Sequence, residues 1–210
     1  MQRVLADELR RLALRGERAR WVRLLVCIGV VFGWLVSATN HGLGPWSEYS
    51  SKLMGSSWVW LAVASLCCLG GRGWRAASLR GLAFLAPAVV TYYLADLLQG
   101  AYGGPRIDTL GLLSDVAAYG VMACLASAAL GAVTVLGRQR GLLGLISRVA
   151  VPAYITQSAL HTFVNARGAT AGPGPIGRNV SLAVGLLGLV TTTIIVVTTP
   201  ARPERSSATR

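Results

Sequence analysis

The chain has 210 residues, of which 53% are hydrophobic and 13% are charged, and its net charge is +12. Soluble proteins average about 25% charged residues, so this composition excludes an ordinary soluble domain and favours a lipid surrounding. No basic stretch is interleaved with base-stacking aromatic residues. The positive charge is therefore attributed to membrane topology, and we expect no nucleic-acid partner.

The first twenty residues are rich in charge and lack the short apolar core of a cleavable signal peptide. Val4, Leu5, Leu9 and Leu12 fall on one helical face, with charged residues opposite. This pattern predicts an amphipathic helix at residues 1–20 that lies on the cytoplasmic leaflet.

Six apolar stretches follow, and each has roughly the ~20 residues that a bilayer core requires. Their approximate bounds are 21–38, 54–70, 81–98, 112–136, 149–166 and 180–199. The prediction is an all-α membrane protein, with one six-helix transmembrane bundle at 21–199 and a cytoplasmic tail at 200–210.

The basic residues predict the orientation of this bundle. Sixteen of the twenty fall in the N-terminal segment, the 70–80 loop, the 137–148 loop and the tail, and four fall in the alternate loops. Because loops on the cytoplasmic side are enriched in Arg and Lys, both termini are predicted to be cytoplasmic. Lys52 is the only lysine. The preference for Arg suggests a GC-rich bacterial genome, and hence the bacterial cytoplasmic membrane.

Two carboxyl groups fall within the predicted spans, where an ionisable residue costs about 2.5–3.5 kcal/mol on insertion scales. Asp96 follows Tyr92 by four residues, and Asp115 precedes Tyr119 by four, so each acid shares a helical face with a tyrosine. Both acids are placed in the outer third of the membrane. If the third and fourth spans are antiparallel neighbours, the two carboxyl groups face one cavity.

Further polar residues are expected at the same depth. In the fifth span Gln157, His161 and Asn165 are spaced by four and form one stripe. The first outer loop adds Asn40, His41, Trp46, Glu48 and Tyr49. The cytoplasmic halves of the spans stay apolar, so the polar groups are predicted to converge at the outer end.

Such a cluster suits acid chemistry. A carboxyl group kept from water holds its proton, and two facing carboxyl groups strengthen this effect. Aromatic faces stabilise cationic charge. The chain has no DDxxD cluster that would hold Mg²⁺ on a diphosphate, so neither a metal nor another cofactor is expected.

Structural explanations compete with the catalytic one. Asp115 or Ser114 would suit the N-cap of a fourth helix that starts late. Asp96 would suit a pair with Arg106 or a side chain that reaches the interface. The tyrosines at 92, 93 and 102 would suit an interfacial aromatic belt, and His161 would suit a hydrogen-bonded bundle histidine.

Three stretches carry a resemblance: NHGLGPW (Asn40–Trp46), the run from Ser56 to Gly81, and VVTYYLADLL (Val89–Leu98). Over about residues 33–119 the chain resembles small bacterial integral-membrane terpene cyclases of indole-sesquiterpenoid pathways, including the drimentine type. The resemblance implies proton-initiated, metal-independent cyclisation of a prenyl or farnesyl chain attached to an indole or diketopiperazine. Where GYY is expected before the acid, this chain has Thr91-Tyr92-Tyr93.

On this hypothesis Asp115 or Asp96 donates the proton, and the other sets its protonation or acts as the final base. The residues expected to shape the chain and stabilise cations are Tyr92, Tyr93, Tyr119, Trp34 and Trp46. The residues expected to orient the acid or bind a polar group are Gln157, His161, Asn40 and Glu48. The alternatives are a small proton-coupled transporter, which needs polar residues along its whole path, and a non-catalytic membrane scaffold.

Overall fold

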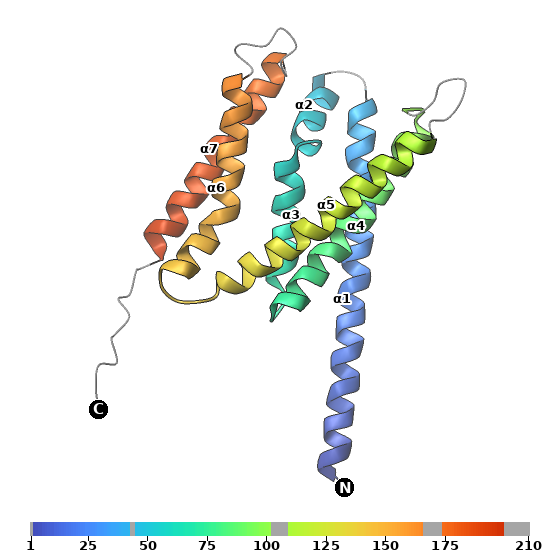
Figure 1. The fold of residues 1–210 in the computed structure, drawn as a ribbon, viewed down its shortest axis with the longest axis vertical. Helices are drawn as coiled ribbons and strands as arrows, with labels where there is room; N and C mark the ends of the chain where they lie inside the picture. Colours follow the sequence, from blue (N-terminus) through green and yellow to red (C-terminus); the bar gives the residue numbers. More distant parts are fainter. Residues whose placement is uncertain (1, 43–44, 102–108, 166–173, 200–210) are drawn as a thin grey trace.

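A computed structural model describes residues 2–42, 45–101, 109–165 and 174–199. These residues form seven helices and no strand (Figure 1). The helices are α1 (Gln2–His41), α2 (Pro45–Met54), α3 (Ser57–Leu69), α4 (Trp74–Leu98), α5 (Thr109–Leu136), α6 (Leu142–Asn165) and α7 (Gly174–Thr198). Tyr102, Arg106 and the tail at 200–210 lie outside the described residues.

The helices are of the membrane type. Four of them are long and apolar enough to cross a bilayer: α1 from Ala19 to His41, α4, α5 and α7. The pair α2 and α3 would make a fifth span, bent by 58° at the break between them. In the described part of the chain, length and composition thus support four or five spans, and the predicted count of six is not confirmed. The predicted span that is missing from this count is α6, which is long enough at 24 residues but contains too many polar ones.

Large apolar side chains remain exposed on the outside of the bundle, among them Val31, Leu98, Leu125 and Val197. Water would penalise such a surface, whereas lipid tails do not. The exposure therefore agrees with the apolar composition, and both support association with a lipid bilayer.

The predicted interfacial helix at residues 1–20 is not a separate element. Helix α1 is continuous over 40 residues, and its N-terminal part projects beyond the other helices (Figure 1). A straight helix cannot lie in the plane of the leaflet and also cross the bilayer. The turn that the prediction required before the first span is missing, since the sequence there has neither Gly nor Pro to break the helix between Glu17 and Gly29.

Three close helix pairs organise the bundle. Helix α4 packs against α1 on one side and α5 on the other, and α6 and α7 form an antiparallel hairpin (Figure 1). Helix α3 lies between these groups and touches α4, α5 and α6. Small residues permit the close approach within the hairpin, because α7 buries Gly177, Ser181, Gly185 and Gly188.

At one end of the bundle, arginine side chains donate hydrogen bonds to backbone carbonyl groups at helix C-termini. Arg80 Nε donates to Cys67 O at 3.1 Å, and Arg138 Nη2 donates to Leu69 O at 2.6 Å, both at the C-terminus of α3. Arg148 Nε donates to Gly137 O at 2.6 Å, just after α5. Carbonyl groups at a helix C-terminus lack partners within the helix and attract cations, so these three arginines cap α3 and α5.

Candidate functional site

The candidate site lies between α1 and α4, around a buried carboxyl group. Asp96 is 7% exposed. Burial is unusual for this residue type, because a carboxyl group that is free in water is ionised at neutral pH. Ser37 Oγ donates a hydrogen bond of 2.5 Å to Asp96 Oδ1, and His41 Nε2 lies 3.2 Å from the same oxygen. Gln99 Nε2 donates to Ser37 Oγ at 2.9 Å. Gln99, Ser37, Asp96 and His41 therefore form one hydrogen-bonded chain, which we call the Asp96 cluster.

The local sequence explains why these groups meet. Gly29, Gly33, Ser37 and His41 are spaced by four on α1, so they form one face. A Cβ added at Gly29 would overlap Phe84 O, and one added at Gly33 would overlap Ala88 O. The two glycines thus bring the backbones of α1 and α4 together, as in small-residue motifs of membrane helices. At that separation the short side chain of Ser37 reaches Asp96.

A second set of hydrogen bonds joins α2 to the same region. Ser51 Oγ donates to Asn40 Oδ1 at 2.6 Å, and Asn40 Nδ2 donates to Tyr92 OH at 3.1 Å. Tyr92 precedes Asp96 by one helical turn. Two of the predicted residues, Asn40 and Tyr92, are therefore in contact and lie beside the acid.

Aromatic rings form a row across four helices. The centroid of Tyr93 lies 5.7 Å from that of Tyr119 and 5.1 Å from that of Tyr92. The ring of Tyr92 lies 6.1 Å from Trp60, and the ring of Trp60 lies 5.1 Å from Phe32. Most of these pairs have edge-to-face geometry, which aromatic quadrupoles favour. Tyr92, Tyr93 and Tyr119 were predicted to act together; Trp60 and Phe32 were not predicted as site residues.

The predicted pairing of Asp115 with Asp96 stays a prediction. The hydrogen bonds described for Asp96 go to Ser37 and His41 on α1. Asp115 is half-buried on α5. A cavity shared by the two acids is therefore not confirmed. The N-cap explanation for Ser114 or Asp115 is wrong, because α5 begins at Thr109 and both residues lie inside the helix.

The polar stripe of α6 does not reach the Asp96 cluster. Gln157, His161 and Asn165 are all exposed, and Asn165 Nδ2 lies 2.9 Å from His161 Nε2. Helix α6 packs chiefly on α7, with smaller contacts to α3 and α5. The polar groups were predicted to converge from three spans. Among the described contacts, the polar groups around Asp96 come from α1, α2 and α4, and α3 and α5 contribute aromatic rings.

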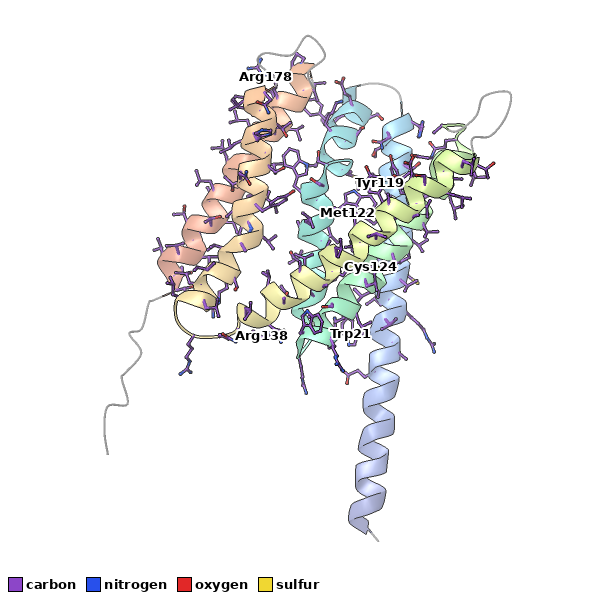
Figure 2. The ribbon with its side chains drawn as sticks, in the orientation of Figure 1. Trp21, Tyr119, Met122, Cys124, Arg138 and Arg178 are labelled. Atoms are coloured by element: carbon purple, nitrogen blue, oxygen red, sulfur yellow. The ribbon has the colours of Figure 1, made fainter. Side chains whose placement is uncertain are left out.

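Three other predicted residues face outward. Trp34 is 55% exposed on the flank of α1 beside Gly33, and Trp46 is 85% exposed on α2. Glu48, also on α2, is exposed. None of them contacts Asp96 in the described structure. Tyr119, in the aromatic row, is itself 55% exposed on α5 (Figure 2).

Two members of the cluster, Ser37 and Gln99, were not predicted. A signal for Ser37 was present in the sequence, since it continues the four-residue spacing of Gly29 and Gly33. Gln99 gave no such signal, because it follows the last residue of α4 and its partner is on another helix.

A cavity of about 720 Å³ lies elsewhere, between α3 and the hairpin of α6 and α7, with α5 at one end. Its wall is mostly aliphatic, and the residues of α3 that line it include Trp58, Val59 and Ala62. Trp60, two residues on from Trp58, belongs to the aromatic row. Helix α3 therefore separates the cavity from the Asp96 cluster.

Comparison of the chain with models of protein families, with curated proteins and with solved structures finds no match. The fold and the buried acid define a helical protein of the membrane type, with a polar cluster where the C-terminal ends of α1 and α4 meet.

Proposed function

We propose that the protein is an integral-membrane terpene cyclase that starts cyclisation by protonating a prenyl chain. The observation that carries the proposal is the buried carboxyl group of Asp96, held by Ser37 and His41 next to a row of aromatic rings. An acid at such a position costs free energy in a membrane, which makes it a candidate functional residue.

Asp96 would be the proton donor. Its proton adds to the terminal double bond of the prenyl chain, and the resulting cation is attacked by the next double bond, which forms the ring C–C bond. Loss of a proton from the cyclised cation restores neutrality, so product and substrate are isomers. No metal or redox partner enters this balance.

His41 would connect the acid to water. Its side chain is 34% exposed, whereas that of Asp96 is 10% exposed, and the two lie 3.2 Å apart. A proton taken up by the imidazole at the end of α1 can pass to Asp96 after each turnover. Ser37 and Gln99 would orient the carboxyl group.

The rings of Tyr92, Tyr93 and Trp60 would stabilise the cationic intermediates. Cation–π attraction is worth ~2 kcal/mol or more where water is excluded. Tyr92, in the middle of the aromatic row, lies one helical turn from Asp96, and this proximity supports a role for the rings beside the proton donor. Asp115, on the next helix, is retained as the candidate for the final base.

We also propose six spans with both termini in the cytoplasm of a bacterium. Helix α6 lies antiparallel to α7 along its length, so it crosses wherever α7 crosses (Figure 1). Arg138 and Arg178 lie at opposite ends of the bundle, as the sequence assignment requires (Figure 2). The polar stripe of α6 then lies within the membrane, where it would need a partner or a polar ligand.

The test uses membranes that contain the protein and a farnesylated indole or a farnesylated diketopiperazine. The expected product has unchanged mass and a different retention time, and it forms only with the intact acid. Asp96→Asn keeps the shape and the hydrogen bonds to Ser37 and His41 but cannot deliver the proton, so the product should vanish. Glu17→Gln, an exposed carboxyl change on α1, is the control. Full cyclisation by Asp96→Asn would overturn the proposal.

A proton-coupled transporter is the second candidate, since the Asp96 cluster resembles a proton relay. Its path would have to continue between α1 and α4, where Gly29 and Gly33 close the interface against Phe84 and Ala88. Substrate-dependent proton uptake into liposomes would favour this function. A scaffold without activity would instead be recognised by co-purification of a partner.

A further inference from the structure

The cavity beside α3 combines an apolar wall with positive charge at one end. Its lining runs along α3 from Trp58 to Leu69. Arg138 and Arg148 also line it, and Arg138 bonds to Leu69 O, so the charge lies at the C-terminal end of α3. Figure 2 shows Arg138 at this end, near the connection between α5 and α6.

We propose that this cavity binds an amphiphile that has a hydrocarbon chain and a phosphate-type anionic head. The volume of about 720 Å³ lies within the ~300–1,000 Å³ that ligand pockets usually have. The chain would lie along α3 among aliphatic side chains, and the head would contact the two guanidinium groups. The proposal concerns a site separate from Asp96 and does not depend on the cyclase.

The charge arrangement favours an anionic head over a neutral one. Both arginines are exposed at the cavity, and their described bonds go to uncharged acceptors: Leu69 O for Arg138, and Gly137 O and Thr199 Oγ1 for Arg148. A guanidinium group has more N–H donors than these bonds use, and it matches phosphate oxygens in pairs. Neither group meets a carboxylate among the described residues, so both retain their charge for a ligand.

The fold also leaves a route for the chain. The hairpin of α6 and α7 packs mainly on itself and has smaller contacts with α3 and α5. The cavity lies in that weakly joined boundary, and exposed Leu66 and Leu187 are among its lining residues. A chain dissolved in the membrane can therefore enter sideways, while its head stays at the interface beside the arginines.

The test measures binding to the purified full-length chain in neutral maltoside micelles by native mass spectrometry. Hexadecyl phosphate is the probe, and hexadecanol and inorganic phosphate are the comparisons. The expected result is one bound hexadecyl phosphate, with at least roughly tenfold weaker retention of hexadecanol and none of phosphate alone, because chain and charge are both needed. Equal retention of hexadecanol would overturn the role of the arginines.

Variants locate the site. Arg138→Gln with Arg148→Gln should weaken binding roughly tenfold or more. Arg140→Gln, an exposed arginine of the same loop that does not line the cavity, should leave binding unchanged. Because the arginine changes also remove helix caps, Ala62→Trp provides an independent variant that fills the cavity and should abolish binding. Unchanged binding by folded Ala62→Trp would overturn the proposed site.

Two sources of such a ligand are separated by a competition arm. If the natural ligand is a membrane phospholipid, phosphatidylglycerol should displace hexadecyl phosphate and should co-purify with the wild-type chain in a one-to-one ratio. If it is a free prenyl phosphate, farnesyl phosphate should displace the probe and phosphatidylglycerol should not. Displacement by neither would contradict the proposal. Asp96→Asn should bind like the wild type, which separates this site from the cyclase.

Discussion

Ser37 Oγ donates a hydrogen bond of 2.5 Å to Asp96 Oδ1, although the two residues are 59 positions apart in the chain. The bond joins α1 to α4, and Ser37 lies one helical turn after Gly33 on α1. It shows that the acid is hydrogen-bonded to the first span. The stability of this helix pair and the position of the acid are therefore linked.

Replacement of Ser37 by Ala should destabilise the protein, because it leaves a buried carboxyl group and Gln99 without their shared partner. The expected cost is about 1 kcal/mol or more, which is at the upper end for polar bonds between membrane helices. The measurement is the midpoint of thermal unfolding in detergent, followed by circular dichroism. Ser65→Ala removes a hydroxyl that bonds within its own helix, to Ala62 O, and is the matched control. Equal midpoints for the two variants would contradict the assigned role of Ser37.

Gly33→Ala should separate α1 from α4, since the added Cβ would overlap Ala88 O, which is backbone and cannot turn aside. Overpacking of this kind costs about 1–3 kcal/mol. Gly120→Ala makes the same change on α5 at a position where nothing lies within 4 Å, so it should be neutral or slightly stabilising. The measurement is the midpoint of thermal unfolding of each variant in detergent. A Gly33→Ala protein as stable as Gly120→Ala would show that α1 and α4 do not approach this closely.

The position of the C-terminus separates six spans from five. Six spans place it on the same side as the N-terminus, and five spans place it on the opposite side. A green fluorescent protein fused after Arg210 should fluoresce, and alkaline phosphatase at the same position should be inactive, if α6 crosses the membrane. The reverse result would mean that α6 does not cross. Fusions after Asn165 provide the complementary control, because that position should lie outside.

The aromatic row should contribute through its rings and not through its hydroxyl groups. Tyr92→Phe breaks the bond from Asn40 but keeps the ring between Trp60 and Tyr93, so most of the cyclase activity should remain. Tyr92→Leu removes the ring and should lower the rate by about tenfold or more, if cation–π stabilisation is worth ~2 kcal/mol. Tyr154→Leu, at an exposed tyrosine of α6, serves as the comparison. The readout is the rate of isomer formation from the farnesylated substrate.

The sequence by itself determined the class of the protein. Apolar composition, long uncharged stretches and clustered arginines are local properties, and each survives in the structure as a long helix, an exposed apolar face or a basic end. Asp96 was also recognisable, because a lone carboxyl group in an apolar stretch is costly wherever the helix packs. Its helical neighbour Tyr92 followed from the spacing of four residues. These inferences needed no knowledge of which helices are neighbours.

The tertiary structure alone decided which face of each helix meets which partner. Periodicity shows that Asp96 and Tyr92 share a face, but it cannot show that this face turns to Ser37 and His41 on α1, while Tyr93 turns to Tyr119 on α5. That choice comes from the close fit at Gly29 and Gly33, which is a property of two helices together. The same reason explains why the α6 stripe lies away from the acid, and why the cavity beside α3 could not be foreseen: both result from how the hairpin of α6 and α7 packs on the remaining helices.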